Sequence, residues 1–189
     1  MNKARRAEIF ARLREQNPSP TTELHYRTPF ELLIAVILSA QATDVGVNKA
    51  TDKLFPVANT PEAILALGLD GLKTYIKTIG LYNAKAENIL KTCEILIQLH
   101  DSRVPTSREA LEALPGVGRK TASVVLGTWF GKAEGVVVDT HVGRISKRLG
   151  MTEHKDPVKI ERDLMEQLPR KEWIDFSHRL VHHGRGLCK

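Results

Sequence analysis

Residues 114–122 read L-P-G-V-G-R-K-T-A, which indicates two helices joined by a tight glycine hairpin. A short helix is predicted over residues 107–114, and the proline and glycine that follow stop it. Gly118 should supply the positive φ that such a hairpin needs. A second helix is predicted over residues 119–131. The free amides of its first turn form a site for an anion such as a phosphate, although an ordinary helix–helix corner also uses glycine.

Lys120 lies in the first turn of this second helix, and V-V-V-D-T-H follows at residues 136–141. The positive end of the helix dipole and partial burial would both disfavour an ammonium at Lys120. The neutral amine is the nucleophilic form. An amine and a carboxylate beside a phosphate site suggest imine chemistry on a sugar. The simpler interpretation is a lysine that only pairs with a phosphate.

Asp139 precedes T-H-V-G-R-I-S-K-R-L and is placed as the N-cap of a helix. A capping carboxylate accepts amide hydrogen bonds, so it should stay ionised at neutral pH. Asp139 would therefore stabilise a developing positive charge better than it would donate a proton. Capping alone is the alternative, and the two roles are compatible.

Composition agrees with a polyanionic partner without requiring one. The chain has 189 residues, a net charge of +6 and a pI of about 9.4. Aromatic residues make up only 5%, which argues against a protein that stacks on single strands. No apolar run approaches the roughly 20 residues of a membrane span, and the charged N-terminus has no signal-peptide core. We expect a cytoplasmic protein that does not enter membranes.

Nearly every segment has a helical pattern, so the fold class is all-α. Apart from residues 136–138, little resembles a strand. The predicted helices cover residues 3–16, 29–41, 45–55, 60–67, 70–77, 83–99, 107–114, 119–131, 140–149, 157–168 and 172–183.

Several segments together resemble the endonuclease III family of helix–hairpin–helix DNA glycosylases. They are S-A-Q-A-T-D at residues 39–44, K-T-I-G-L-Y-N-A-K-A at 77–86, the hairpin motif, V-D-T-H, and H-G-R-G-L-C at 183–188. They occur in the family's order, and the resemblance covers the whole chain. It implies two helical domains flanking a DNA-binding cleft. One is a six-helix barrel over residues 22–132, with the helix–hairpin–helix at about 107–131. The other comprises residues 1–21 and 133–189.

The resemblance also implies roles for individual residues. Lys120 matches the Schiff-base lysine and Asp139 the essential aspartate, on opposite lips of the cleft. Gln41 matches the residue that fills the space left by a flipped nucleotide, and Leu81 matches a wedge into the opposite strand. From the residues alone, Gln41 could simply end a helix and Leu81 could be a core leucine. The remaining expected DNA contacts are Gly116, Val117, Gly118, Arg119 and His141.

The implied function is base-excision repair. The protein would be a DNA N-glycosylase with AP lyase activity on oxidised pyrimidines in duplex DNA, cutting by β-elimination through the lysine Schiff base. The expected partner is double-stranded DNA with damaged pyrimidines or abasic sites, and the protein is expected to bind it as a monomer. The expected location is the cytoplasm and, in a bacterium, the nucleoid. Two alternatives stay open: a monofunctional mismatch glycosylase, and a helix–hairpin–helix DNA-binding module without catalysis.

The cysteines depart from the family pattern. Most members bind a 4Fe–4S cluster through four cysteines near the C-terminus, but this chain has two cysteines in all. Cys188 stands where the first ligand should, and Cys93 is predicted to be a buried hydrophobe. One thiolate cannot hold a cluster that needs four. We therefore expect a chain cut at the cluster loop, with no cofactor of its own, and a cluster in the uncut family member.

Overall fold

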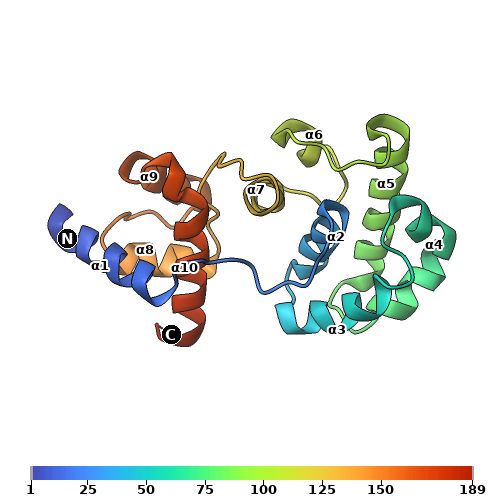
Figure 1. The fold of residues 1–189 in the computed structure, drawn as a ribbon, viewed down its shortest axis with the longest axis horizontal. Coiled ribbons are helices and arrows are strands. Elements are labelled where there is room, and N and C mark those ends of the chain that lie inside the picture. The colour runs from blue at the N-terminus through green and yellow to red at the C-terminus, as the bar shows by residue number, and fades with distance from the viewer. Residues whose placement is uncertain (1, 189) are drawn as a thin grey trace. The chain divides into compact units, whose positions relative to one another are not determined.

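A computed structural model describes residues 2–188, and every regular element in this range is a helix (Figure 1). The all-α fold class predicted from the sequence is therefore confirmed. The helices are α1 (Lys3–Gln16), α2 (Pro29–Ser39), α3 (Asp44–Leu54), α4 (Pro61–Ile76), α5 (Tyr82–His100), α6 (Arg108–Glu112), α7 (Arg119–Thr128), α8 (Thr140–Arg148), α9 (Pro157–Gln167), the 3₁₀ turn η1 (Arg170–Glu172) and α10 (Trp173–Gly186).

Local sequence explains where most of these helices start. Several begin at a side chain that accepts a hydrogen bond from a backbone amide of the first turn, and proline often follows as the first helical residue. Thr28 caps α2 in this way, Thr60 caps α4 and Asp156 caps α9, each followed by proline. These caps satisfy amides that would otherwise lack a partner within the helix.

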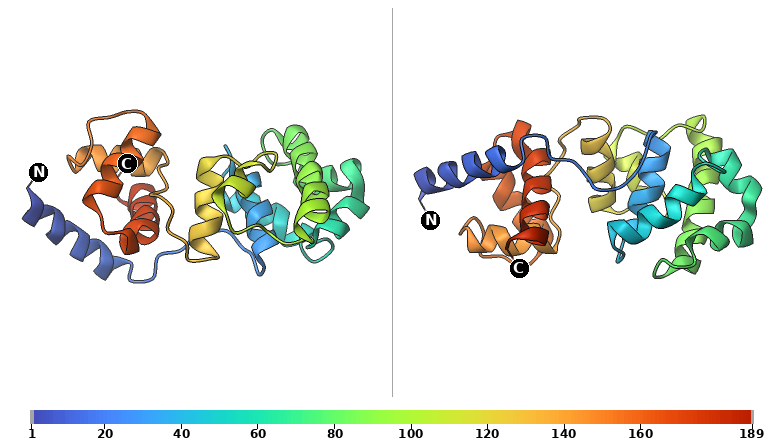
Figure 2. Two further views of the ribbon diagram at one scale, coloured as in Figure 1. Left: turned by 90° about the horizontal axis from the view of Figure 1, so that it is seen from above. Right: turned by 60° about the horizontal axis from the view of Figure 1, so that its bottom comes forward.

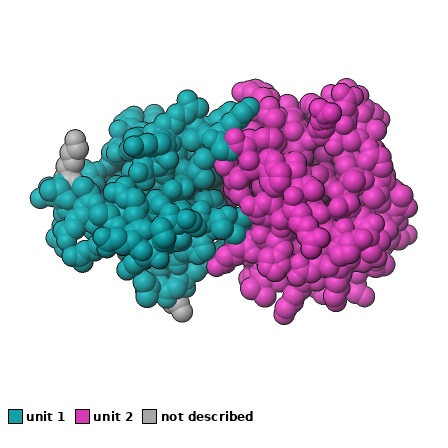
Figure 3. Space-filling model, in the orientation of Figure 1, with its two compact units in different colours: residues 1–22, 131–189 teal, residues 23–130 magenta. Residues whose placement is uncertain are grey.

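The chain divides into two compact units, one of residues 23–130 and one of residues 1–22 with 131–189 (Figure 3). The first unit contains α2 to α7. Helix α2 is buried on all sides from Phe30 to Leu38, as expected for a helix that is apolar all round its circumference. Helices α4 and α5 run side by side in each view (Figure 2).

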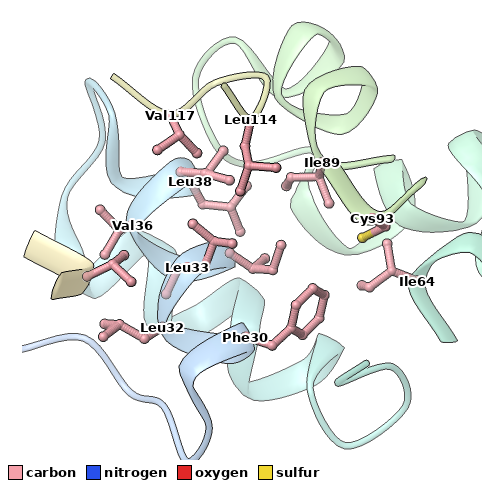
Figure 4. Packing of buried hydrophobic residues seen from close by; sticks show 14 of the residues in the cluster. Phe30, Leu32, Leu33, Val36, Leu38, Ile64, Ile89, Cys93, Leu114 and Val117 are labelled. Carbon is pink, nitrogen blue, oxygen red and sulfur yellow. The ribbon is translucent and has the colours of Figure 1, made fainter. Parts of the chain in front are cut away.

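The core of residues 23–130 gathers side chains from every helix of that unit. Figure 4 shows Leu114 and Val117 of the glycine hairpin beside Leu38 of α2, and Cys93 of α5 beside Ile64 of α4. The hairpin is therefore anchored by its own apolar side chains, which fixes the backbone between them.

The other unit has its own core, made by α1, α8, α9 and α10. Phe10 of α1 meets Phe176 of α10 edge to face, with ring centroids 5.3 Å apart. Arg179 is buried, and its guanidinium donates to the Asn17 carbonyl and pairs with Asp175 at 3.2 Å. These contacts tie the end of α1 to the C-terminal helix.

Some predicted elements differ in detail. The predicted helices 60–67 and 70–77 form one element, α4, with non-helical backbone at Gly68, where φ is 67°. The helix predicted to reach residue 41 ends at Ser39, and the one predicted to reach 131 ends at Thr128. Residues 136–138 form no strand within the described part of the chain.

Candidate functional site

The glycine hairpin links α6 to α7, but its positive φ lies at another glycine than predicted. Gly116 has φ of 79°, whereas Gly118 is extended (φ −95°, ψ 179°) and serves as the N-cap of α7. The prediction for Gly118 was wrong because the turn closes earlier. The Val117 amide donates to the Leu114 carbonyl at 3.1 Å, which makes Gly116 the third residue of a β-turn, where a positive φ favours glycine. Gly116 is also closely packed, since a Cβ there would lie 3.3 Å from the Cβ and Nδ2 of Asn88. A larger residue would be strained at this position.

Helix α5 packs against the hairpin. The Thr92 hydroxyl donates to the Pro115 carbonyl at 3.0 Å. Leu114 and Val117 are only 2% and 5% exposed, so the Val117 side chain belongs to the core. Val117 can therefore contact DNA only through its backbone. Asn88 and Thr92 were not identified from the sequence, although both lie on the helical face of the buried Ile89.

Lys120 is the second residue of α7, and its side chain is exposed. The partial burial of Lys120 that the sequence suggested is therefore not observed. Gly118 has no side-chain cap for this helix, and the neighbouring Arg119 is exposed. The arrangement places backbone amides, the positive end of the helix dipole and a lysine amine at one helix start. Such a site accommodates an anion.

Asp139 is the N-cap of α8, as predicted, and its carboxylate accepts from the Val142 amide at 2.8 Å. The segment before it is held by the Ser177 hydroxyl, which accepts from the Val137 amide at 3.0 Å. His141 packs against Gly184, where a Cβ would lie 2.9 Å from the His141 ring nitrogen Nδ1. Asp139 and His141 belong to the unit of residues 1–22 and 131–189, whereas Lys120 belongs to the other unit.

Gln41 and Leu81 occupy two neighbouring loops of the unit that also carries Lys120. Both have left-handed backbone, with φ of 54° and 60°, and the Leu81 side chain is 62% exposed. A Cβ at residue 80 would lie 3.8 Å from the Gln41 carbonyl oxygen. A non-glycine residue in this conformation costs on the order of 1–3 kcal/mol. The structure excludes the alternative in which Leu81 is a core leucine.

A buried lysine lies beneath these loops and was not identified from the sequence. Lys85 is 6% exposed, and its amine donates to the carbonyls of Leu38 and Ala40 at 2.8 and 2.6 Å. Burial lowers the pKa of Lys85 below that of an ordinary lysine. The sequence signal was its register, because Lys85 shares the buried face of α5 with Ile89 and Thr92. A lysine on an otherwise buried face requires a specific polar partner.

The two cysteines of this sequence supply fewer ligands than the four thiolates or equivalents that an iron–sulfur cluster needs. Cys93 is fully buried in the core of residues 23–130, and burial raises the pKa of its thiol to about 12. The Cys188 thiol accepts from the Arg148 guanidinium at 2.9 Å. In residues 2–188 no group of three or more histidines, cysteines and acids is placed to hold a metal ion. The role of Cys188 as a cluster ligand stays a prediction.

Comparison with known proteins agrees with this geometry. Residues 34–170 match the model of the HhH-GPD superfamily of base excision DNA repair proteins. The chain is 64% identical to endonuclease III of Haemophilus influenzae and 60% identical to that of Escherichia coli, in each case over all of this chain and 89% of the relative. The chain belongs to the endonuclease III family.

Solved structures give the same result. A non-covalent endonuclease III–DNA complex superposes with a TM-score of 0.94 at 45% identity, covering 100% of this chain and 88% of the other. A trapped covalent endonuclease III–DNA intermediate gives a TM-score of 0.93 at 44% identity, with 100% and 89% covered. A thermostable thymine-DNA glycosylase is more distant, at 0.81 and 28%, with 96% and 87% covered.

Family membership confirms the fold and the enzyme class expected from the sequence. The protein is a base-excision repair DNA glycosylase with lyase activity, and both alternative functions are disfavoured. Across the described residues, no helix is both long and apolar enough to cross a membrane.

Proposed function

We propose that this protein removes oxidised pyrimidines from duplex DNA and cuts the strand at the resulting abasic site, with Lys120 as the nucleophile. The observation that carries the proposal is the start of α7. There the exposed Lys120 lies in the first helical turn, two residues after the N-cap Gly118. The amides of this hairpin would hold a phosphate next to the lesion. The enzyme would act as a monomer on chromosomal DNA in the cytoplasm.

In the first step, the damaged nucleotide leaves the helical stack, which costs a few kcal/mol and least for a damaged base. The Lys120 amine then attacks C1′ of the sugar. The glycosidic bond breaks, and its electron pair leaves with the base, which takes up a proton. The Asp139 carboxylate stabilises the positive charge that develops on the sugar.

The covalent product then becomes a Schiff base as the sugar ring opens and C1′ forms a double bond to the Lys120 nitrogen. The imine acidifies the C2′ proton. Loss of that proton breaks the C3′–O bond, so the phosphate leaves and the strand is cut 3′ to the lesion. Water finally hydrolyses the imine and returns the lysine amine.

Borohydride trapping tests the proposal directly, because hydride reduces the imine to a stable amine. Incubation with borohydride and duplex DNA carrying an abasic site should give a covalent complex of protein and DNA. A monofunctional glycosylase would release the base from a duplex with a damaged base but give no trapped complex. A DNA-binding module would release no base and give no complex, so absence of the trapped complex would contradict the proposed chemistry.

Leu81 is proposed to wedge into the strand opposite the lesion, so we expect Leu81→Ala to lower excision from duplex DNA. Cleavage at pre-formed abasic sites should be affected less, because those sites are easier to open. Leu81 is 62% exposed, so the melting temperature should hardly change. Leu72→Ala is the control, because Leu72 is fully buried and its truncation should cost roughly 2–5 kcal/mol of stability. An equal loss on both substrates would contradict the wedge.

A pocket of the same unit should contribute to DNA affinity. It has a volume of about 580 Å³ and lies between α3 and α4, close in sequence to Gln41 and Leu81. Its described lining includes Lys49, Lys53 and Lys77 but no acidic residue. Asp52 of α3, which does not line the pocket, is paired with His25 at 3.0 Å. We propose that the three lysines bind backbone phosphates of the duplex.

Replacement of Lys49, Lys53 and Lys77 by glutamine should weaken binding to duplexes of any sequence. The slope of the logarithm of the binding constant against the logarithm of the salt concentration is negative. It should become shallower by roughly 0.9 for each phosphate that the protein no longer neutralises. Lys91→Gln is the control, because Lys91 is an exposed lysine of α5 that does not line the pocket. An unchanged slope in the triple variant would mean that the pocket does not contact DNA.

A further inference from the structure

Lys85 connects the two loops that carry Gln41 and Leu81. Its ammonium donates to the carbonyls of Leu38 and Ala40, at the C-terminal end of α2 and immediately before Gln41. Carbonyls at a helix C-terminus have no partner within the helix, and the negative end of the helix dipole favours a cation there. The side chain of Lys85 therefore holds the Gln41 loop.

The backbone of Lys85 holds the other loop. Its amide donates to the Leu81 carbonyl at 3.0 Å, which closes the first turn of α5. Leu81 is the N-cap of this helix and has left-handed backbone, with no side-chain cap. A Cβ added at Gly80 would lie 3.8 Å from the Gln41 carbonyl oxygen, so the two loops that Lys85 binds run close to each other.

A helix end needs no buried cation for stability alone. Helices commonly end at a glycine with left-handed backbone, and this satisfies the terminal carbonyls without removing a charge from water. Here the left-handed residue is Gln41, the capping group is an ammonium, and Lys85 is 6% exposed. In this arrangement, the positions of the exposed Gln41 and Leu81 side chains depend on Lys85.

We infer that Lys85 is a positioning residue that holds the Gln41 and Leu81 loops at a fixed separation, so that both side chains enter the duplex together. This inference rests on the proposed function of the two loops. Lys85 itself would touch neither the reacting sugar nor Lys120. It acts only on the opening of the duplex.

The test is Lys85→Met, which retains the length of the side chain and removes its hydrogen-bond donors. A 2-aminopurine opposite the lesion reports unstacking by its fluorescence. We expect unstacking and excision from duplex DNA to slow by about tenfold to a hundredfold, the range produced by small misplacements. Borohydride trapping on a single-stranded abasic oligonucleotide should change little, because no duplex has to be opened.

A double-mutant cycle separates positioning from general damage. If Lys85 acts through the two loops, Lys85→Met should add little to a Gln41→Ala, Leu81→Ala variant. Ile64→Val is the stability control, because it weakens the core of the same unit away from the loops. Equal losses on duplex and single-stranded substrates, or full additivity in the cycle, would overturn the inference.

The remaining outcomes are also decisive. If Lys85→Met does not fold, Lys85→Gln retains an NH₂ donor group and should show a smaller defect with the same preference for duplex substrate. A Lys85→Gln variant without that preference would overturn the inference. If the unaltered protein gives no trapped complex on abasic DNA, the proposed function fails instead. The two failures are therefore distinguishable.

Discussion

Lys120→Gln should abolish the borohydride-trapped complex and lower strand cleavage by several orders of magnitude. The amide side chain has no nucleophilic nitrogen, so neither C1′ attack nor the Schiff base can occur. Binding to damaged DNA should be largely retained, because the amides of Gly118 and Arg119 at the start of α7 are unchanged. Trapping gels and binding isotherms on one abasic duplex measure both effects.

Lys91→Gln provides the matched comparison for this prediction. It also replaces an exposed lysine of the same unit by glutamine, but on α5 and outside the hairpin. It should trap and cleave like the unaltered protein. A trapped complex that persists in Lys120→Gln would show that another amine is the nucleophile.

Asp139→Asn should lower base excision by orders of magnitude while the fold survives. Asparagine still accepts the Val142 amide that Asp139 holds at 2.8 Å, so stability should fall by about 1 kcal/mol or less. The lost charge can no longer stabilise the cationic sugar. Single-turnover excision from a duplex with an oxidised pyrimidine, together with a thermal melt, gives both quantities.

Asp156→Asn is a control of the same kind in the same unit. Asp156 caps α9 and accepts from the Lys159 amide at 3.0 Å, with no proposed role in catalysis. Both variants should lose a similar small amount of stability, and only Asp139→Asn should lose activity. Parallel losses of melting temperature and activity at Asp139 would mean that this residue is only a cap.

Much of the fold was predictable because its signals are local. Thr28 before Pro29 and Asp139 before Thr140 mark helix starts that the structure places at the same residues. A side chain that satisfies the amides of its own next turn needs no distant partner, so a short window of sequence is enough. The glycine hairpin and its flanking helices were recognised on the same basis.

The sequence by itself also determined the kind of chemistry. Lys120 at a helix start and Asp139 at another are positions that local pattern predicts, and the family resemblance supplied their expected roles. The family and its enzyme class were then confirmed by similarity to endonuclease III over the whole of this chain. The roles of the individual residues are what the substitutions above measure.

Tertiary packing decided what no local pattern encodes. Gly116 lies against Asn88 of α5, where a Cβ would come within 3.3 Å of the asparagine side chain. The exposure of Leu81 and the burial of Lys85 depend on how α2 and α5 meet, since the ammonium finds its carbonyl partners on a helix remote in sequence. Such contacts join segments far apart in the chain, and only the folded structure brings them together.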